Sequence, residues 1–235
     1  MTQPRKRTVI LISGRGSNMA ALIEAAREKE FPAQIVGVVS DRADAPGLKA
    51  AESFGIPTRV VPRKDHPTAE AHEKTLDAAL ARLKAEIVCL AGYMRVLTAG
   101  FVDRWQGRLV NVHPALLPAF PGLDTHRRAL DAGLLIHGCS VHFVTHEVDT
   151  GPLIAQAAVP VLVGDRPEQL SQRVLKAEHK LYPLALALLA AGKVRLEGGR
   201  AVFADIDQSA RTGTLISPAS WQGPSDLEDL ARITP

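Results

Sequence analysis

Short segments that are apolar on both faces alternate with segments of helical spacing in the first half of the chain. The apolar segments are 8–12, 35–40, 58–61 and 86–91, and helical spacing is found over 18–28, 46–54 and 69–84. A strand with two apolar faces is buried between two layers, as in a parallel sheet covered by helices. These features predict an α/β fold with a Rossmann-like, doubly wound, mostly parallel sheet.

The second half of the chain follows a different pattern. Strand-like segments at 138–144 and 153–160 are joined by a short turn with Gly and Pro, which predicts an antiparallel extension of the sheet in the C-terminal half. A long helix is expected over 166–191, with Asp165 as its N-cap, Pro183 inside it and Gly192 after its end. A hairpin over 193–203 completes a single expected domain, residues 1–204. Residues 205–235, rich in Ser, Gly, Pro and Thr, are expected to form a loosely attached tail.

Composition argues against several classes of function. The 235 residues are 46% apolar, enough for a sizeable core, while a formal charge of +3 and 4% aromatic residues argue against a nucleic-acid partner. No apolar run is long enough to span a membrane and the first residues do not resemble an export signal, so we expect a cytoplasmic protein with no membrane partner. Cys89 and Cys139 lie in apolar segments and are expected to be buried free thiols. No CxxC pair occurs, and no metal is expected.

A glycine-containing turn, Ser13-Gly14-Arg15-Gly16-Ser17-Asn18, follows the first predicted strand. Its glycines let the backbone approach a ligand, and the amides at the start of the next helix face an anion, so a phosphate is the expected ligand. The turn lacks the third glycine of the dinucleotide fingerprint and the Gly-Lys-Ser/Thr of a P-loop, so neither an NAD site nor an NTP site is supported. A tight turn without a ligand is the alternative interpretation.

An amide and an imidazole are placed together by the segment Asn111-Val112-His113-Pro114. Residues two apart on a strand share a face, and Pro114 ends the strand directly after them. Asp149 lies in the turn between the two later strands, where it is either a turn former or a partner of His113. A carboxylate beside an imidazole favours its protonated form, which can donate to a developing oxyanion. No serine or cysteine stands in a recognisable nucleophile position, so the trio suggests direct transfer between two substrates.

Two further features have open interpretations. The segment 94–97 follows a predicted internal strand, at the sheet edge where ligands of α/β proteins bind. Met94, Val96 and Leu97 are either a surface for a flat apolar cosubstrate or residues that cap the core. His142 is either a core histidine or part of the site, and His146 is expected to be exposed.

Seven segments in collinear order, spread over residues 7–200, carry a resemblance to a known family. They are SGRGSN at 13–18, LAGYMR at 90–95, NVHPALLP at 111–118, FPG at 120–122, SVHFV at 140–144, DTGP at 149–152 and AEH at 177–179. In these segments the chain resembles the phosphoribosylglycinamide formyltransferases. The resemblance implies an enzyme that transfers a formyl group from 10-formyltetrahydrofolate to the amine of glycinamide ribonucleotide, the third step of de novo purine biosynthesis.

The resemblance also implies roles for individual residues and for partners. The substrate phosphate would bind at Gly16, Ser17 and Asn18, with Glu178 contacting the ribonucleotide. The cosubstrate would contact Met94, Arg95, Val96, Leu97, Asn111 and His142, and the catalytic residues would be Asn111, His113 and Asp149. The implied ligands are small molecules, with no metal, and the implied assembly is a monomer or a homodimer.

The chain departs from the family pattern at Ala69. The family commonly has an arginine there, so either Arg63 or Lys64 replaces that anionic contact or the contact is absent.

Three other functions are alternatives to the one that the resemblance implies. A 10-formyltetrahydrofolate hydrolase is related but usually carries an additional N-terminal domain. Methionyl-tRNA formyltransferase carries a further C-terminal domain, which we do not expect here. A non-catalytic nucleotide-binding module would need the phosphate turn alone, and the trio at 111, 113 and 149 argues against it.

Overall fold

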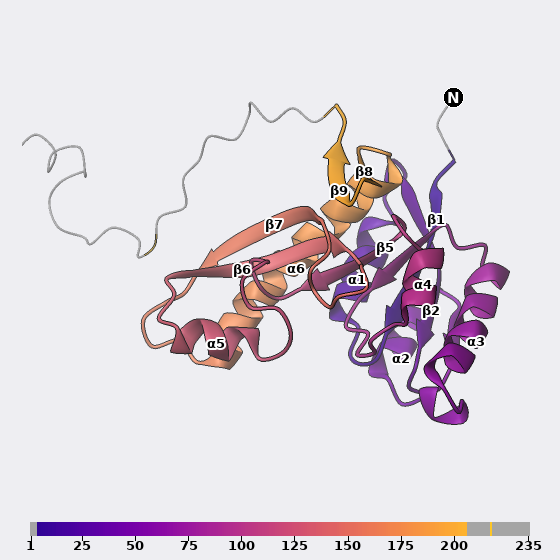
Figure 1. The fold of residues 1–235 in the computed structure, drawn as a ribbon, viewed down its shortest axis with the longest axis horizontal. Coiled ribbons are helices and arrows are strands. Elements are labelled where there is room, and N and C mark those ends of the chain that lie inside the picture. Colours follow the sequence, from indigo (N-terminus) through magenta and orange to yellow (C-terminus); the bar gives the residue numbers. More distant parts are fainter. Residues whose placement is uncertain (1–3, 206–216, 218–235) are drawn as a thin grey trace, which may run out of the picture.

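The computed structural model describes residues 4–205 and residue 217, and its centre is one seven-stranded sheet (Figure 1). The strands are β1 (Lys6–Ile12), β2 (Ala33–Ser40), β3 (Thr58–Val60), β4 (Ile87–Leu90), β5 (Leu109–His113), β6 (Ile136–Phe143) and β7 (Leu153–Pro160). Their order across the sheet is β3-β2-β1-β4-β5-β6-β7, with parallel pairing from β3 to β5 and antiparallel pairing of β6 with β5 and β7. The predicted fold class is confirmed, including the antiparallel extension.

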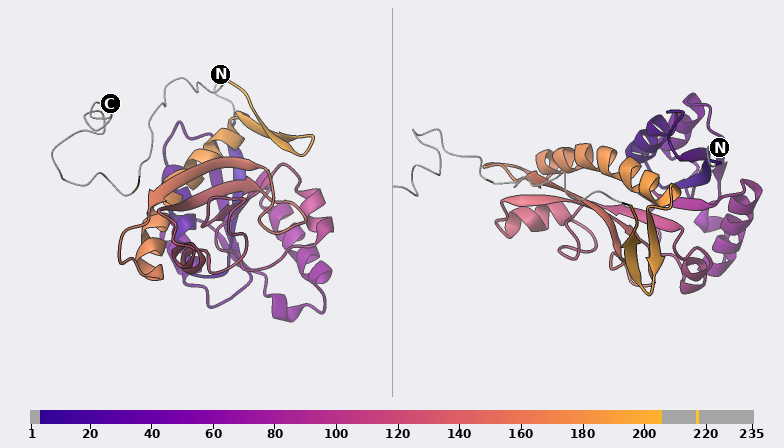
Figure 2. Two further views of the ribbon diagram at one scale, coloured as in Figure 1. Left: turned by 60° about the vertical axis from the view of Figure 1, so that its left-hand side comes forward. Right: turned by 90° about the horizontal axis from the view of Figure 1, so that it is seen from above.

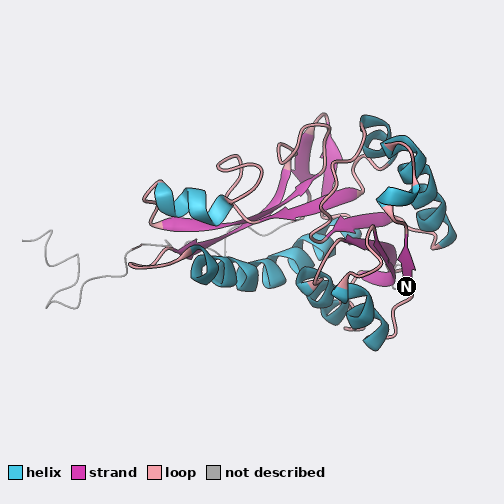
Figure 3. Ribbon diagram, turned by 90° about the horizontal axis from the view of Figure 1, so that it is seen from below, coloured by secondary structure: helices cyan, strands magenta, loops and turns pink. Residues whose placement is uncertain are grey.

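Helices cover both faces of the sheet. They are α1 (Ser17–Ala25), α2 (Pro46–Ser53), α3 (Ala69–Arg82), α4 (Ala99–Arg104), α5 (Thr125–Asp131) and α6 (Pro167–Ala190), with a 3₁₀ turn, η1 (Arg63–Asp65), before α3. Helices α1 and α6 lie on one face of the parallel strands and α3 and α4 on the other (Figures 2 and 3). A separate antiparallel hairpin, β8 (Val194–Glu197) and β9 (Arg200–Phe203), follows α6 as predicted.

The alternation of side chains along β1 explains why the strand is apolar on both faces. Ile10 and Ile12 join the core cluster under α1 and α6, whereas Val9 and Leu11 join the cluster under α3 and α4. All four are fully buried, and each such side chain contributes roughly 1.5–3 kcal/mol of transfer free energy. One strand therefore stabilises two cores, which a strand with one polar face cannot do.

Helix α6 is joined to the sheet near the end of two strands. Tyr182 is fully buried, and its hydroxyl lies 3.0 Å from the carbonyl oxygen of Leu90 and 3.1 Å from that of Val110. The single hydroxyl proton is shared between these two acceptors. This contact fixes α6 against β4 and β5 directly beside Asn111, the next residue of β5.

Two expectations about helices were wrong or incomplete. The N-cap of α6 is Arg166 rather than Asp165, because both Asp165 carboxylate oxygens are engaged elsewhere, by the Arg173 guanidinium at 2.6 and 3.0 Å and by the Leu162 amide at 2.8 Å. The N-cap amide instead donates to the Gln169 side chain at 2.9 Å. Helices α4 and α5 were not predicted, since helices of six and seven residues show too little periodicity to be read.

Other predictions concern the two cysteines, the C-terminal tail and membrane-spanning segments. Cys89 and Cys139 are buried and free, as predicted. The predicted tail lies outside the described residues, apart from Asp205 and Ser217. Within the described part of the chain, the search for a helix long and apolar enough to cross a membrane finds none.

Candidate active site

The end of β5 holds the predicted amide and imidazole, and its pairing with β6 adds a second imidazole. Asn111 lies opposite His142 across the two strands, and His113 lies opposite Ser140. The Asn111 Nδ2 atom is 3.4 Å from His142 Nε2. The sequence could not decide between a core and a site role for His142, because the pairing partner of β5 cannot be read from local pattern. The structure places it beside Asn111 and Asp149.

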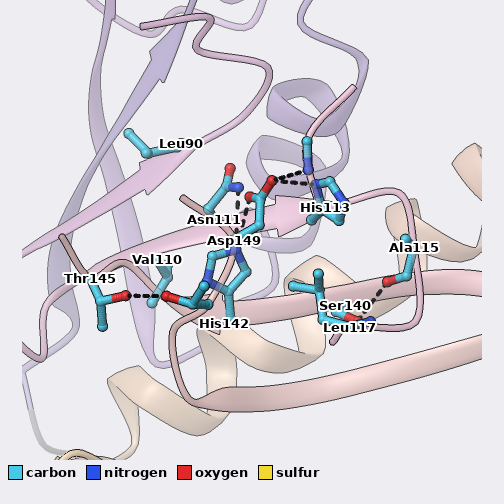
Figure 4. Close-up of polar contacts among 12 residues, drawn as sticks. Leu90, Val110, Asn111, His113, Ala115, Leu117, Ser140, His142, Thr145 and Asp149 are labelled. Atoms are coloured by element: carbon cyan, nitrogen blue, oxygen red, sulfur yellow. Dashed lines mark hydrogen bonds and ion pairs between the residues drawn. The ribbon is translucent and has the colours of Figure 1, made fainter. Parts of the chain in front are cut away.

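Asp149 joins these residues from the turn between β6 and β7 (Figure 4). Its Oδ2 lies 3.3 Å from His113 Nδ1, and its Oδ1 lies 3.7 Å from His142 Nε2. The Asp149 side chain is only 9% exposed, and its Oδ2 also accepts a hydrogen bond from the Gly122 amide at 2.9 Å. A carboxylate so far removed from water interacts strongly with the neighbouring imidazole. The structure thus brings Asn111, His113 and Asp149 together.

The His113 ring has hydrogen-bond acceptors at both nitrogens. Nδ1 faces the Asp149 carboxylate, and Nε2 lies 2.9 Å from the Phe120 carbonyl oxygen. An imidazole donates from both nitrogens only when it is protonated. The ring is buried, so its two nitrogens face protein acceptors rather than water.

The surroundings of His142 favour its neutral form. Burial lowers the pKa of His142, an effect that the carbonyl of Phe143 and the Asp149 carboxylate only partly oppose. His142 Nδ1 is 2.8 Å from the Phe143 carbonyl, so the neutral ring donates there and leaves Nε2 as an acceptor toward the Asn111 amide. The two histidines that flank Asp149 therefore differ in their hydrogen-bond partners.

The predicted phosphate turn forms the start of α1. Gly16 is the N-cap, with φ of 75° in the left-handed region that favours glycine, and Ser17 and Asn18 begin the helix. The Gly47 amide donates to the Gly14 carbonyl at 3.0 Å, and a Cβ atom at Gly47 would come within 2.9 Å of that oxygen. The turn is thus held in place, with free helix-terminal amides available to an anion.

Glu178 reaches the phosphate turn from α6. Its Oε2 accepts a hydrogen bond of 2.6 Å from Asn18 Nδ2. Burial raises the pKa of Glu178, an effect that the Asn18 amide partly opposes. A buried carboxylate beside an anion-binding turn is costly to folding, which points to a role in ligand binding rather than in stability.

The segment 94–97 follows β4 and is hydrogen-bonded to the phosphate turn, because the Met94 amide donates to Ser13 Oγ at 2.9 Å. Met94 and Val96 are 65% and 76% exposed, whereas Leu97 packs against the core beneath α3 and α4. The Arg95 guanidinium donates to the buried Asp41 carboxylate at 2.6 Å. Two of the four residues thus present apolar side chains to solvent, as a surface for a flat ligand would require.

The departure at Ala69 lies at the first residue of α3, directly after the N-cap Thr68. Of the two basic candidates to replace the family arginine, Arg63 donates to the His66 carbonyl at 2.7 Å. Lys64 lies beside it in η1. The geometry selects neither, so no residue of this segment is assigned to the site.

Two histidines that are close in sequence lie in different parts of the structure. His142 and His146 are four residues apart, a spacing that suits a metal site on a helix, but His142 is in β6 and His146 is in the exposed turn that follows. His146 Nε2 is 2.7 Å from an Asp103 oxygen, away from Asp149. Within the part of the chain that the structure describes, no group of three or more His, Cys, Asp or Glu residues is arranged to hold a metal ion.

A family model described as Formyl transferase matches residues 6–186. The chain belongs to the formyl transferase family. It is 43% identical to "Phosphoribosylglycinamide formyltransferase" of Escherichia coli over 80% of this chain and 89% of that protein. It is 50% identical to the "Trifunctional purine biosynthetic protein adenosine-3" of Bos taurus over 84% of this chain, and it spans only 20% of that larger relative.

Solved structures of the family have the same fold. The phosphoribosylglycinamide formyltransferase of Brucella melitensis is 60% identical, with a TM-score of 0.77 over 80% of this chain and 97% of that chain. A formyltetrahydrofolate deformylase of Pseudomonas syringae is 25% identical, with a TM-score of 0.78 over 87% of this chain and 67% of that chain. Both enzymes share the fold of this chain, and the transferase is the more similar in sequence.

Sequence reasoning missed two members of the site, both of which act through the backbone. These are the Phe120 carbonyl and the Gly122 amide, which contact His113 and Asp149. Backbone groups leave no compositional signal. A Pro-Gly pair such as that at 121–122 is typical of a turn, but the pattern does not say that the turn folds back onto the end of β5.

Proposed function

We propose that this formyl transferase transfers the formyl group of 10-formyltetrahydrofolate to the amine of glycinamide ribonucleotide, the phosphoribosylglycinamide that appears in the names of its more similar relatives. The observation that carries the proposal is the group Asn111, His113 and Asp149 at the end of β5, beside an anion-binding turn that is bonded to the segment 94–97. The proposed ligands of that turn and segment are the ribonucleotide phosphate and the folate ring.

The proposed mechanism is direct attack. The neutral amine of the ribonucleotide attacks the formyl carbon, and the carbonyl oxygen becomes an oxyanion that accepts a hydrogen bond from the Asn111 amide and lies against the His113 imidazolium. His113 Nε2 keeps its hydrogen bond of 2.9 Å to the Phe120 carbonyl, so His113 stabilises the oxyanion by its charge. When the tetrahedral intermediate collapses, the bond from carbon to the folate nitrogen breaks. The amine proton then moves to that nitrogen, with Asp149 assisting through water.

A deformylase is the second candidate, since a family member with that activity shares the fold. Both reactions begin with attack on the same formyl carbon, by an amine in one and by water in the other. The Glu178 contact to the phosphate turn, 2.6 Å from Asn18, favours the transferase because only the transferase needs a ribonucleotide site.

One assay separates the candidates. The protein is mixed with 10-formyltetrahydrofolate, with and without glycinamide ribonucleotide, and the folate absorbance is followed. We expect turnover only with the ribonucleotide. Turnover without it would support the deformylase, and no turnover in either mixture would contradict an enzymatic role in formyl transfer.

The variant His113→Ala tests the assignment of the site. Removing one oxyanion-stabilising group typically costs about 10²–10³ in kcat, so we expect most turnover to be lost while ribonucleotide binding, measured by calorimetry, is nearly unchanged. The exposed His146 is the matched control, and His146→Ala should retain activity. A fully active His113→Ala enzyme would refute the assignment.

A further inference from the structure

The connection between β5 and α5, residues 114–124, places two backbone groups against proposed catalytic side chains. The Phe120 carbonyl accepts from His113 Nε2 at 2.9 Å, and the Gly122 amide donates to Asp149 Oδ2 at 2.9 Å. Both contacts come from the same short turn, although His113 and Asp149 belong to different elements. The position of this turn therefore affects both members of the pair.

The backbone of this turn adopts an unfavourable conformation. Phe120 and Asp124 have φ of 56° and 57°, and Gly122 has φ of 80°. A non-glycine residue in the left-handed region persists only where surrounding contacts hold it. On its inner side, the turn contacts His113 and Asp149.

Arg128 contacts the same turn from α5. Its Nη1 donates to the Pro121 carbonyl at 2.6 Å and lies 3.3 Å from the Leu123 carbonyl. Its guanidinium carbon is 5.3 Å from the centroid of the Phe120 ring, within the range of a cation–π interaction. One side chain thus contacts the residues on either side of Gly122 and the ring of Phe120.

We propose that Arg128 is a positioning residue for formyl transfer, which holds the Phe120 carbonyl toward His113 and the Gly122 amide toward Asp149. The inference rests on the proposed function of this site. Arg128 is exposed at the surface and touches neither His113 nor Asp149, so its effect passes through the turn. The planar guanidinium stacks on a ring by its face and donates hydrogen bonds from its edge, unlike the compact ammonium of lysine.

The first test uses the free protein and needs no activity. The ring nitrogens of His113 are observed by two-bond ¹H–¹⁵N correlation spectra and assigned by their loss in His113→Gln. We expect these signals to shift in Arg128→Gln, because the acceptor at Nε2 moves. The neighbouring Arg127 is also exposed and makes no side-chain hydrogen bond within residues 4–205, so Arg127→Gln is the matched control. Unchanged His113 signals in Arg128→Gln would overturn the proposal.

The second test separates binding from turnover. We expect Arg128→Gln to lower kcat by about tenfold, since small displacements of catalytic groups cost up to about a hundredfold, while KM for both substrates stays the same. Arg128→Lys should lie between the parent and Arg128→Gln. A kcat equal to that of Arg127→Gln would overturn the proposal, even if the His113 signals shift.

Failure of the proposed function can be distinguished from failure of the Arg128 proposal. A parent enzyme without ribonucleotide-dependent turnover would refute the proposed function, while the spectra of His113 would still decide whether Arg128 positions the turn. Should Arg128→Gln fail to fold, as judged by circular dichroism, Phe120→Leu removes the stacked ring and keeps the carbonyl. Its His113 signals must then shift, and no shift would overturn the proposal.

Discussion

Asp149 is the residue on which the candidate site most depends, and its backbone restricts what can replace it. Its φ of 58° lies in the left-handed region, which asparagine and aspartate tolerate better than other non-glycine residues. Asp149→Asn therefore removes the charge beside His113 without adding backbone strain. Because the proposed mechanism uses the Asp149 carboxylate beside the His113 ring, we expect kcat to fall by roughly 10²–10⁴ with little change in the thermal midpoint.

Steady-state kinetics and thermal unfolding of Asp149→Asn check this prediction. The exposed Asp103, which pairs with His146 at 2.7 Å, gives the control Asp103→Asn, and its kcat should match that of the parent. If Asp149→Asn kept parental turnover, the carboxylate would be a turn former only.

Glu178 combines a cost to folding with a proposed role in binding. Burial raises its pKa above the ordinary value of 4.5, so the folded state holds this proton more tightly than the unfolded state. The corresponding stability is present at low pH and is lost as pH rises through the folded pKa. We therefore expect Glu178→Gln, which keeps an acceptor for Asn18, to be more stable than the parent at pH 8 but not at pH 4.

The same variant should bind the ribonucleotide more weakly. Loss of a hydrogen bond to a charged group typically costs about 1.5–3 kcal/mol, so KM for the ribonucleotide should rise tenfold or more. Thermal midpoints at pH 4 and pH 8, together with KM values, test both effects. The control is Glu168→Gln on the exposed first turn of the same helix, which should show neither. A Glu178→Gln protein less stable than the parent at pH 8 would contradict the argument.

For individual residues, the sequence predicted which side chains share one face of a strand, but not which groups contact them from other parts of the fold. Asn111 and His113 were placed together because alternation along one strand is a local rule. The neighbour of Asn111 on β6, His142, could not be assigned because it follows from pairing across 31 residues. The Phe120 carbonyl and the Gly122 amide could not be found at all, since every residue has these groups.

The turn between β6 and β7 is positioned by a close backbone approach at Gly151. A Cβ atom there would lie 1.7 Å from the Phe143 carbonyl oxygen, a distance that no local adjustment of a side chain can relieve. Gly151→Ala must therefore displace the turn that carries Asp149. We expect kcat to fall by about a hundredfold or more and the protein to lose stability by roughly 1–3 kcal/mol.

The matched control for this element is Gly100→Ala in α4. A Cβ atom at Gly100 would meet only the tip of the Arg104 side chain, at 3.5 Å, and alanine favours a helix by up to about 1 kcal/mol over glycine. Urea unfolding and kcat should therefore show a neutral or stabilised, fully active protein. Equal losses in both variants would show that the close approach at Gly151 is not the cause.

Whether a helix or strand could be predicted depended on its length and on whether its sequence pattern lies within the element itself. Strands of the parallel sheet were predicted because two apolar faces leave a pattern in the residues themselves, as in β1. The N-cap of α6 was misplaced by one residue because the contact between Asp165 and Arg173 spans two turns of the helix. Such competition for a carboxylate is set by tertiary contacts, which propensity does not record.

At the scale of the molecule, the sheet gathers the site from distant parts of the chain. The phosphate turn follows β1, the segment 94–97 follows β4, and Asn111 and His113 end β5. These are three neighbouring parallel strands, whose carboxyl ends meet at one edge of the sheet. Helix α6 then crosses this edge with Tyr182 against β4 and β5 and Glu178 against Asn18. The fold class thus implied the location of the candidate site, while β6 and the turn that follows it bring His142 and Asp149 to it.

The extent of the functional domain gives the last prediction. Among the described residues, both core clusters are built from residues between Val9 and Val194, and Ala201 is the last of these residues to pack against them. The family match ends at residue 186. We therefore propose that residues 1–205 form the complete formyltransferase domain, as the sequence predicted for 1–204. A chain that ends at Asp205 keeps the ion pair of 3.2 Å between Lys193 and Asp205.

The free energy of unfolding of this shortened chain should lie within about 0.5 kcal/mol of that of the full chain, as for changes away from a core. Its kcat/KM should equal that of the full chain. Urea unfolding and kinetics of the two chains decide this, and a large loss in either quantity would assign residues 206–235 to the core or to the site.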